Sequence, residues 1–247
     1  MDKMVHTSLR SMQGIMNRQT AIANNMANAN TTGFRSEIVS AQALYLNGDT
    51  LDSRATVKEY VLDADMNPGS VNSTGRPLDI AIQGDAMLAV QAPNGEEAYT
   101  RRGDLQLTES GLVTTGDGFP VLSRSGPLIL PAADEIRIAD DGGVWVVPPG
   151  GDPMQPQQAG QLKIASPQGS EIVKHTDTLF HVRGGGILPD DPNGRLITGA
   201  LEGSNVNMTQ ALVDMIETSR AWEAQVKLLT TAQELDESGA SVMRMPT

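Results

Sequence analysis

The chain has no cysteine among its 247 residues. This absence excludes disulfide bonds, thiolate metal sites and cysteine nucleophiles. Aromatic residues are also scarce, at 3% of the chain. Because aromatic side chains usually anchor tight ligand pockets, their scarcity favours long interfaces made of many small contacts.

Long hydrophobic segments are absent as well. No apolar run is long enough to cross a bilayer. The segment Met1–Arg18 lacks the apolar core of a secretory signal peptide. These features by themselves predict a cytoplasmic protein.

The formal net charge of −12 is spread unevenly along the chain. Residues 1–35 carry four basic residues against one acidic residue, whereas residues 205–247 carry three against six. The remaining middle is acidic, which argues against a nucleic-acid partner. Ends of opposite charge favour pairing with each other or with neighbouring copies.

The N-terminal part has the periodicity of an amphipathic helix. From about Lys3 to Thr32, apolar side chains recur at steps of three and four, with a gap at Gln19: Val5, Leu9, Met12, Ile15, Met16, Ile22, Ala23 and Met26. We expect this helix to stop at Gly33, in a left-handed conformation.

A second long helix is predicted over about Asn207–Val242. Its apolar face contains Leu212, Met215, Ile216, Trp222, Val226, Leu229 and Ala232. Asn207 is the candidate N-cap, because Gln210 follows three residues later as in a capping box. About 35 residues at 1.5 Å each predict a rod of roughly 50 Å.

The middle of the chain predicts short strands separated by turns rich in Pro and Gly. The predicted strands are Leu78–Gln83, Met87–Gln91, Leu105–Thr108, Leu112–Thr115, Leu128–Leu130, Ile136–Ile138, Val144–Val147, Leu162–Ala165, Ile172–Lys174 and Leu179–Val182. Hairpin turns are expected at Pro93–Gly95 and Asp140–Gly143, and an exposed loop at Pro148–Gln158.

The expected fold is therefore α+β. The N-terminal helix in residues 1–35 pairs with its C-terminal counterpart in 205–247 to form a coiled-coil-like helical region. An extended connector covers 36–75. A β-rich central domain, all-β and sandwich- or barrel-like, covers 76–204. Isolated helices are marginal in water, so the terminal helices must pair with each other, with other copies, or both.

No catalytic or cofactor site stands out, and we expect none. The three histidines, His6, His175 and His181, have no obvious ligand set around them. Asp63–Gly69 begins like a calcium loop, but its glycine is one position late and Thr74 stands where a bidentate carboxylate is required. The run Gly184–Gly186 lacks the following helix of a phosphate cradle.

The most informative segment is Ala23–Arg35, in which asparagine alternates with alanine. Asn24 and Asn28 are four residues apart and share one helix face. Alanines allow close approach of backbones, and buried amides can fix the register of a helical seam. The plainer interpretation is a polar helix end that passes into a turn.

These residues resemble the flagellar basal-body rod and hook family. The N-terminal signature is carried by Ala23–Asn28 and by Thr31, Gly33, Phe34 and Arg35. Leu78–Asp85 with Tyr99–Gly103 resembles the central β segment of the family, and Gly203–Asn207 resembles its C-terminal signature. Ala86, Met87 and Leu88 replace the glycine and phenylalanines usual in the hook and distal-rod branches, which favours the proximal-rod branch.

The resemblance implies a non-enzymatic structural subunit of the periplasmic rod, exported without a cleaved signal peptide by the flagellar type III export apparatus. Its partners would be copies of itself and other rod proteins in a helical assembly, with no nucleic acid, cofactor or small-molecule substrate. The implied subunit interface comprises Leu9, Met12, Met16, Ala23, Asn24, Met26, Asn28, Gly33, Phe34, Asn205, Leu212, Met215, Trp222, Val226 and Leu229.

Three alternatives remain at this point. One is a distal-rod or hook-type axial protein of the same family. The second is a secreted β-rich enzyme or carbohydrate-binding module, which would need a polar cluster or aromatic platform. The third is a cytoplasmic coiled-coil adaptor, which the large β-rich middle disfavours.

Overall fold

The computed structural model describes residues 2–45, 55–175 and 177–243. Contacts divide the chain into two units. The helical unit consists of Met1–Ala27, Glu37–Asp63 and Asn207–Thr247. The β body consists of Asn28–Ser36 and Ala64–Val206. The chain therefore passes between the two units four times.

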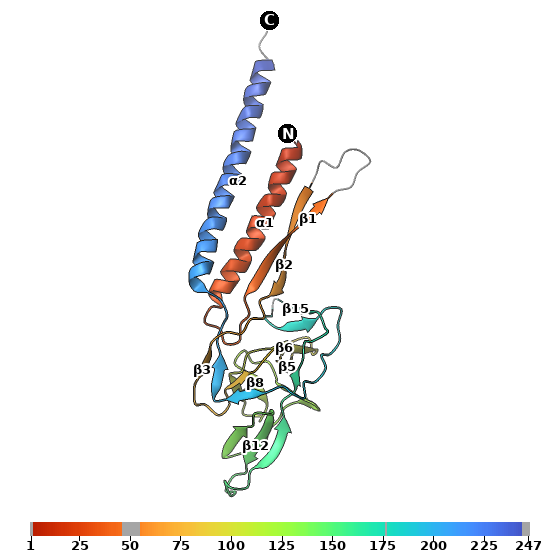
Figure 1. Cartoon of the computed structure of the whole chain (residues 1–247), viewed down its shortest axis with the longest axis vertical. Coiled ribbons are helices and arrows are strands. Elements are labelled where there is room, and N and C mark those ends of the chain that lie inside the picture. The colour runs from red at the N-terminus through yellow and green to blue at the C-terminus, as the bar shows by residue number, and fades with distance from the viewer. Residues whose placement is uncertain (1, 46–54, 176, 244–247) are drawn as a thin grey trace. The chain divides into compact units, whose positions relative to one another are not determined.

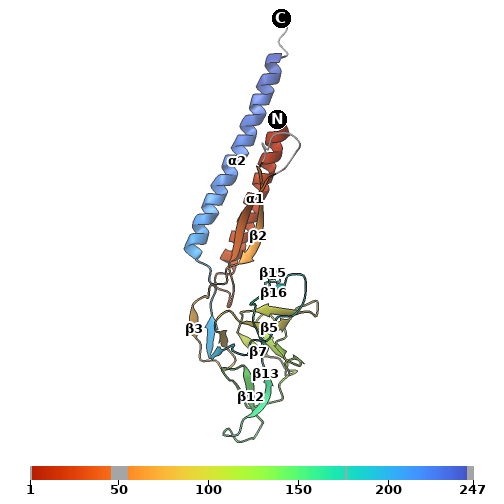
Figure 2. The ribbon, with the colours of Figure 1, turned by 45° about the vertical axis from the view of Figure 1, so that its right-hand side comes forward.

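The helical unit is built on two long helices that lie side by side and run in opposite directions (Figures 1 and 2). Helix α1 spans Asp2–Ala27 and α2 spans Met208–Met243. Helix α1 also packs against β1 (Glu37–Tyr45), which pairs with β2 (Ala55–Ala64). Because α2 has 36 residues and α1 has 26, α2 extends beyond the first residues of α1 (Figure 1).

The start of α2 confirms the predicted N-cap. The Oδ1 atom of Asn207 accepts a hydrogen bond from the backbone N–H of Gln210 (3.2 Å). The side chain of Gln210 does not return to Asn207; its Nε2 donates to Asp214 Oδ1 (2.9 Å). The capping box is thus half formed, and Asn207 stabilises the first turn of the helix alone.

The end of α1 corrects the prediction of a helix that continues to Thr32. Helix α1 stops at Ala27, and a turn follows in which the carbonyl of Asn28 accepts from Thr31 N (3.1 Å). The Oδ1 atom of Asn28 also accepts from Thr31 Oγ1 (3.1 Å). Asparagine side chains compete with the helix for hydrogen bonds, so the asparagine-rich run ends the helix early. Gly33 has the expected positive φ of 67°, but within the β body.

The β body contains small antiparallel sheets. The largest has the strand order β14–β5–β6–β16–β15, formed by Ile164–Ala165, Met87–Gln91, Glu97–Thr100, Phe180–Val182 and Ile172–Lys174. A three-stranded sheet has the order β11–β12–β13, formed by Glu135–Ile138, Gly143–Val147 and Gln157–Gln161. The other strands described for this unit form pairs: β17 (Leu196–Thr198) with β4 (Ile80–Ile82), β18 (Ala200–Glu202) with β3 (Val71–Ser73), β7 (Leu105–Leu107) with β8 (Val113–Thr115), and β10 (Gly126–Pro127) with β9 (Leu122–Ser123).

Two hydrophobic clusters meet at β5. Leu88 and Val90 belong to the larger cluster, whereas Met87 and Ala89 belong to the smaller one. Because successive side chains of a strand point to opposite faces, β5 is buried on both sides. This explains why its sequence reads as a continuous apolar run.

The α+β class is confirmed, and two predicted strands, Met87–Gln91 and Ile172–Lys174, have the predicted bounds. The turn Pro93–Gly95 joins β5 to β6, and the turn Asp140–Gly143 leads from β11 into β12, with Gly95 and Gly142 at positive φ.

Elsewhere the strand predictions need correction. Leu128–Leu130 is not a strand, because Leu128 and Leu130 are buried from a loop while Ile129 makes only an isolated bridge. Gln157–Gln161 forms β13, although the sequence predicts a loop as far as Gln158. Its polar residues give no periodic signal, and pairing with β12 makes it a strand. The segment 36–75, expected as a connector, contains β1, β2 and β3.

Candidate assembly site

In both helices, buried and half-buried side chains recur at steps of four and three, and we call these positions the seam. On α2, buried and half-buried residues follow steps of four and three: Ala211, Met215, Thr218, Trp222, Gln225, Leu229 and Ala232. On α1 the same spacing relates Ser8, Met12, Ile15, Gln19, Ile22 and Met26. Five of the predicted interface residues therefore pack within the helical unit: Met12, Met26, Met215, Trp222 and Leu229.

Beside this seam, both helices carry apolar side chains that the chain itself leaves exposed. On α1, Leu9 and Met16 are 57% and 53% exposed, and Ala23 is exposed one further heptad along. On α2, Leu212 and Ile216 are 46% and 54% exposed. Met208 and Val226 lie on the same side of α2, 18 residues or five turns apart, and are also exposed. We call these seven residues the outer stripe.

The asparagines near the end of α1 hold the first strand of the helical unit. Asn25 Oδ1 accepts from Glu37 N (2.7 Å), and Asn25 Nδ2 donates to Glu37 O (3.0 Å). The side chain thus replaces a neighbouring strand at the start of β1. Asn24 Nδ2 donates to Glu37 Oε1 (2.5 Å). Both amides therefore fix α1 to β1 within one chain.

Within the β body, the segments that lead to the helical unit converge on Glu202. We call these segments the neck: Thr31–Ser36, Asp65–Gly69 and Glu202–Asn205. Glu202 Oε1 accepts from Arg35 Nη2 (2.7 Å) and from Gly69 N (2.9 Å). The backbone carbonyl of Glu202 accepts from Gly33 N (2.7 Å). One residue at the end of β18 thereby holds two of the other neck segments.

Arg101 completes a buried ion cluster with Glu202 and Arg35. Its Nε (3.0 Å) and Nη2 (2.7 Å) donate to Glu202 Oε2. The guanidinium also donates to the carbonyls of Ile82, Gly84 and Ala86. Burial lowers the pKa of Arg101, and the charge of Glu202 opposes this shift. The carboxylate and the surrounding carbonyls together offset the cost of removing the guanidinium from water.

Asn205 joins all three segments of the neck. Its Oδ1 accepts from Ser36 N (2.7 Å), and its Nδ2 donates to the carbonyls of Asp65 (2.7 Å) and Asn67 (3.0 Å). The backbone N–H of Asn205 donates to Phe34 O (3.3 Å). The oxygen and the nitrogen of the amide side chain are therefore both hydrogen-bonded. They fix the points at which the chain leaves the β body.

Phe34 and the following carbonyl are held by Lys174, the last residue of β15. The Nζ atom of Lys174 lies 3.4 Å from the centre of the Phe34 ring and donates to Arg35 O (2.9 Å). Phe34 is 4% exposed. The cation–π contact and the hydrogen bond tie the N-terminal signature to the edge of the five-stranded sheet.

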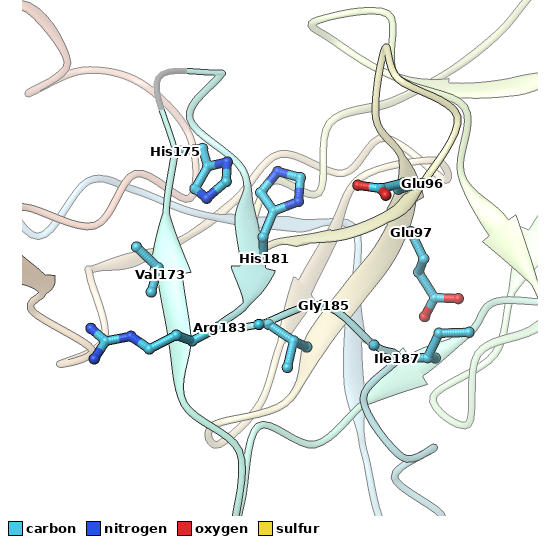
Figure 3. Close-up of a pocket in the computed structure, with 11 residues that line it drawn as sticks. Glu96, Glu97, Val173, His175, His181, Arg183, Gly185 and Ile187 are labelled. Atoms are coloured by element: carbon cyan, nitrogen blue, oxygen red, sulfur yellow. The ribbon is translucent and has the colours of Figure 1, made fainter.

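The most enzyme-like feature of the β body is a cavity of about 540 Å³ beside β15 and β16. Figure 3 shows the rings of His175 and His181 side by side in its lining, with Glu96 and Glu97 from the opposite segment. The two rings stack with centroids 4.3 Å apart, and His181 Nε2 lies 3.1 Å from Asp177 Oδ2. The two histidine rings thus contact each other, and His181 also contacts Asp177.

The described residues contain neither a metal-binding cluster nor a membrane-spanning helix. No group of three or more His, Cys, Asp or Glu side chains among them is placed to hold a metal ion. None of the described helices combines the length and apolarity needed to cross a membrane.

The predicted interface residues thus fall into separate places. Leu9, Met16, Ala23, Leu212 and Val226 lie on the outer stripe. Gly33, Phe34 and Asn205 lie in the neck, and Asn24 and Asn28 have partners inside the chain. The predicted interface omits Ile216 of the outer stripe, although periodicity places this residue on the apolar face. It also omits Glu202 and Arg101, which have no local pattern to single them out.

Comparison with known proteins gives matches along most of the chain. The family description "Flagella basal body rod protein" matches residues 12–35. "Flagellar hook protein FlgE/F/G D1 domain" matches residues 81–146, and "Flagellar basal body rod FlgEFG protein C-terminal" matches residues 197–242. The first match includes the end of α1 and the neck as far as Arg35, and the last includes Glu202–Asn205 and the start of α2.

Whole-chain relatives agree with these matches. The chain is 38% identical over 240 residues to the flagellar basal-body rod protein FlgF of Salmonella typhimurium, with 95% of each chain covered. It is 37% identical over 240 residues to FlgF of Escherichia coli, again with 95% of each covered. The flagellar basal-body rod protein FlgG of Bacillus subtilis is 28% identical over 252 residues, covering 94% of this chain and 95% of the relative.

Proposed function

Because the chain belongs to the family of flagellar basal-body rod proteins, we propose that it polymerises through its terminal helices. The protein is a structural subunit of the basal-body rod. The proposal concerns how such a subunit joins its neighbours. The outer stripe is the assembly surface, and the contact between α1 and α2 holds together the two helices that carry it.

The exposed apolar residues of the outer stripe carry this proposal. Leu9 and Met16 are exposed seven residues apart on α1, and Leu212 and Ile216 are exposed four apart on α2, so each helix has large apolar side chains repeated along one side. A group of exposed apolar side chains marks a surface that another molecule can cover. Burying them costs no hydrogen bonds and removes apolar area from water. Covered by helices of other copies, the stripe would extend the internal seam into a coiled coil of several chains.

The partners that we propose are copies of this chain and other rod proteins. Two kinds of rod protein, FlgF and FlgG, match this chain over nearly its whole length. The higher identity to FlgF of Salmonella typhimurium and Escherichia coli than to FlgG of Bacillus subtilis supports a place in the proximal rod, in the periplasm. We also propose that the flagellar type III export apparatus exports the chain to that place. The β body, whose small sheets share buried clusters, would act as a sandwich- or barrel-like module, and no enzymatic role is proposed.

A secreted β-rich binding module is the alternative of another class. Its support would have to come from the cavity in Figure 3, where the two histidine rings stack on each other and His181 also contacts Asp177. The outer stripe would have no role in such a module. The exposed apolar side chains therefore favour the rod subunit.

The test compares two isoleucine variants in a strain that lacks the gene. Ile216→Asp places a charge on the outer stripe, and Ile129→Asp places one on the β body, where Ile129 is 63% exposed. We expect Ile216→Asp to abolish swimming and rods in isolated basal bodies, and Ile129→Asp to leave both intact. Normal rods with Ile216→Asp would refute assembly through the outer stripe.

A further inference from the structure

The buried ion cluster of the neck has an excess positive charge. Arg35, Arg101 and Glu202 are each 2% exposed or less, so two cations share one carboxylate inside the β body. Arg101 and Glu202 already have hydrogen-bond partners at all of their side-chain polar groups. The Nε, Nη1 and Nη2 groups of Arg101 all donate to partners, and both oxygens of Glu202 accept from groups other than Arg35.

Arg35 is the under-bonded member. Its Nη2 donates to Glu202, but its Nε and Nη1 have no hydrogen-bond partner although they are buried. A buried donor without an acceptor costs about 1–3 kcal/mol. Removing one member of a buried ion pair is costly when it leaves the other charge unpaired, but without Arg35 the carboxylate of Glu202 still accepts from Arg101 and from Gly69 N. The ion pair with Glu202 therefore accounts for Nη2 of Arg35 and leaves its Nε and Nη1 groups unexplained.

The position of Arg35 suggests another reason. It is followed by Ser36, the last residue before the chain enters the helical unit. Its carbonyl is held by Lys174, and Asn205 binds the next residue. The spare donors of Arg35 thus lie at the neck, where the linkers to the polymerising helices begin.

We propose that Arg35 is an assembly residue: in the rod, the linkers around it shift, and its Nε and Nη1 groups bind a carboxylate of an adjoining subunit. This inference rests on the proposed polymerisation through the helices. A carboxylate is the acceptor that neutralises the extra charge of the cluster, and it forms strong charge-assisted hydrogen bonds with arginine. The chain supplies such acceptors in excess, because its net charge is −12 and α2 exposes Glu217 and Glu223.

The test separates stability from assembly with two matched variants of the full chain. Arg35→Met fills a similar volume but removes the spare donors. We expect its urea midpoint to equal or exceed that of the unchanged protein, while swimming falls to that of the deletion strain. Arg101→Met is the control. It removes both donors to Glu202 Oε2 and the donors to the carbonyls of Ile82, Gly84 and Ala86, so its midpoint falls.

Two results would overturn the inference. If Arg35→Met lowers the midpoint as much as Arg101→Met does, Arg35 is only a structural tie. If Arg35→Met leaves swimming normal, its spare donors have no role in the rod. Ile216→Asp, measured in parallel, tests the proposed function separately. If Ile216→Asp stops swimming and Arg35→Met does not, the role of Arg35 is refuted and assembly through the outer stripe is not.

Discussion

Gly33 lies directly against the backbone of Arg101. A Cβ atom added at Gly33 would stand 2.4 Å from the carbonyl carbon of Arg101 and 2.5 Å from its oxygen. Gly33 also has a positive φ of 67°. Position 33 therefore fits only a residue without a side chain, because the backbone of Arg101, which follows β6, lies directly against it.

This contact predicts a large effect for Gly33→Ala. A positive φ costs alanine about 1–2 kcal/mol, and forcing a methyl group into a packed site costs about 1–3 kcal/mol more. Gly75→Ala is the control, because Gly75 has a φ of 71° but nothing within 4 Å of its added Cβ. In urea unfolding of the purified protein, Gly33→Ala should lose clearly more stability than Gly75→Ala. If the two variants lose equal stability, the neck can accommodate the methyl group and the close contact with Arg101 has no energetic consequence.

A second prediction concerns two asparagines that are close in sequence and different in role. Asn205→Ala removes hydrogen bonds to Ser36, Asp65 and Asn67, so it should destabilise the β body by about 2–3 kcal/mol. Asn207→Ala removes the N-cap of α2 and should cost about 1 kcal/mol of helix stability.

The two variants are distinguished by amide hydrogen exchange. Asn205→Ala should speed exchange at Ser36, whose N–H then loses its acceptor, and Asn207→Ala should speed it at Gln210. Unchanged exchange at Ser36 in Asn205→Ala would contradict the role given to the neck.

A third prediction concerns limited proteolysis of the dilute monomer. Because the outer stripe is uncovered there, both terminal helices should be cut while the β body survives. The structure sharpens the expected boundaries. Residues 28–36 belong to the β body, so N-terminal cuts should fall before Asn28 and C-terminal cuts after Val206. Mass spectrometry of the resistant material checks this, and full protection of both helices in the monomer would count against an uncovered assembly surface.

The terminal helices are largely predictable from the sequence, because their signals are local. The three-and-four spacing and the cap at Asn207 predict α2 to within a residue or two. The same spacing cannot separate two adjacent faces of α2. Met215 and Trp222 pack inside the chain, whereas Leu212 and Ile216 lie on the outer stripe. Periodicity reports a wide apolar face but not which half of it the chain covers.

The neck cannot be predicted from local patterns, because its contacts join distant parts of the sequence. Arg101 and Glu202 are 101 residues apart, and Ser36 and Asn205 are 169 apart. Burial of a charged residue follows from the fold and leaves no local pattern. The family signature predicts an interface role for Phe34, and the structure places this residue against Lys174. A signature marks residues that matter without saying whether they act within a chain or between chains.

Chemical labelling tests most directly whether the outer stripe is the assembly surface. The chain has no cysteine, so a single Ile216→Cys or Ile129→Cys substitution provides one thiol for a maleimide reagent. We predict that Ile216→Cys reacts in the purified monomer and is protected in isolated basal bodies, while Ile129→Cys reacts in both. Equal labelling of Ile216→Cys in monomer and basal bodies would contradict assembly through the outer stripe.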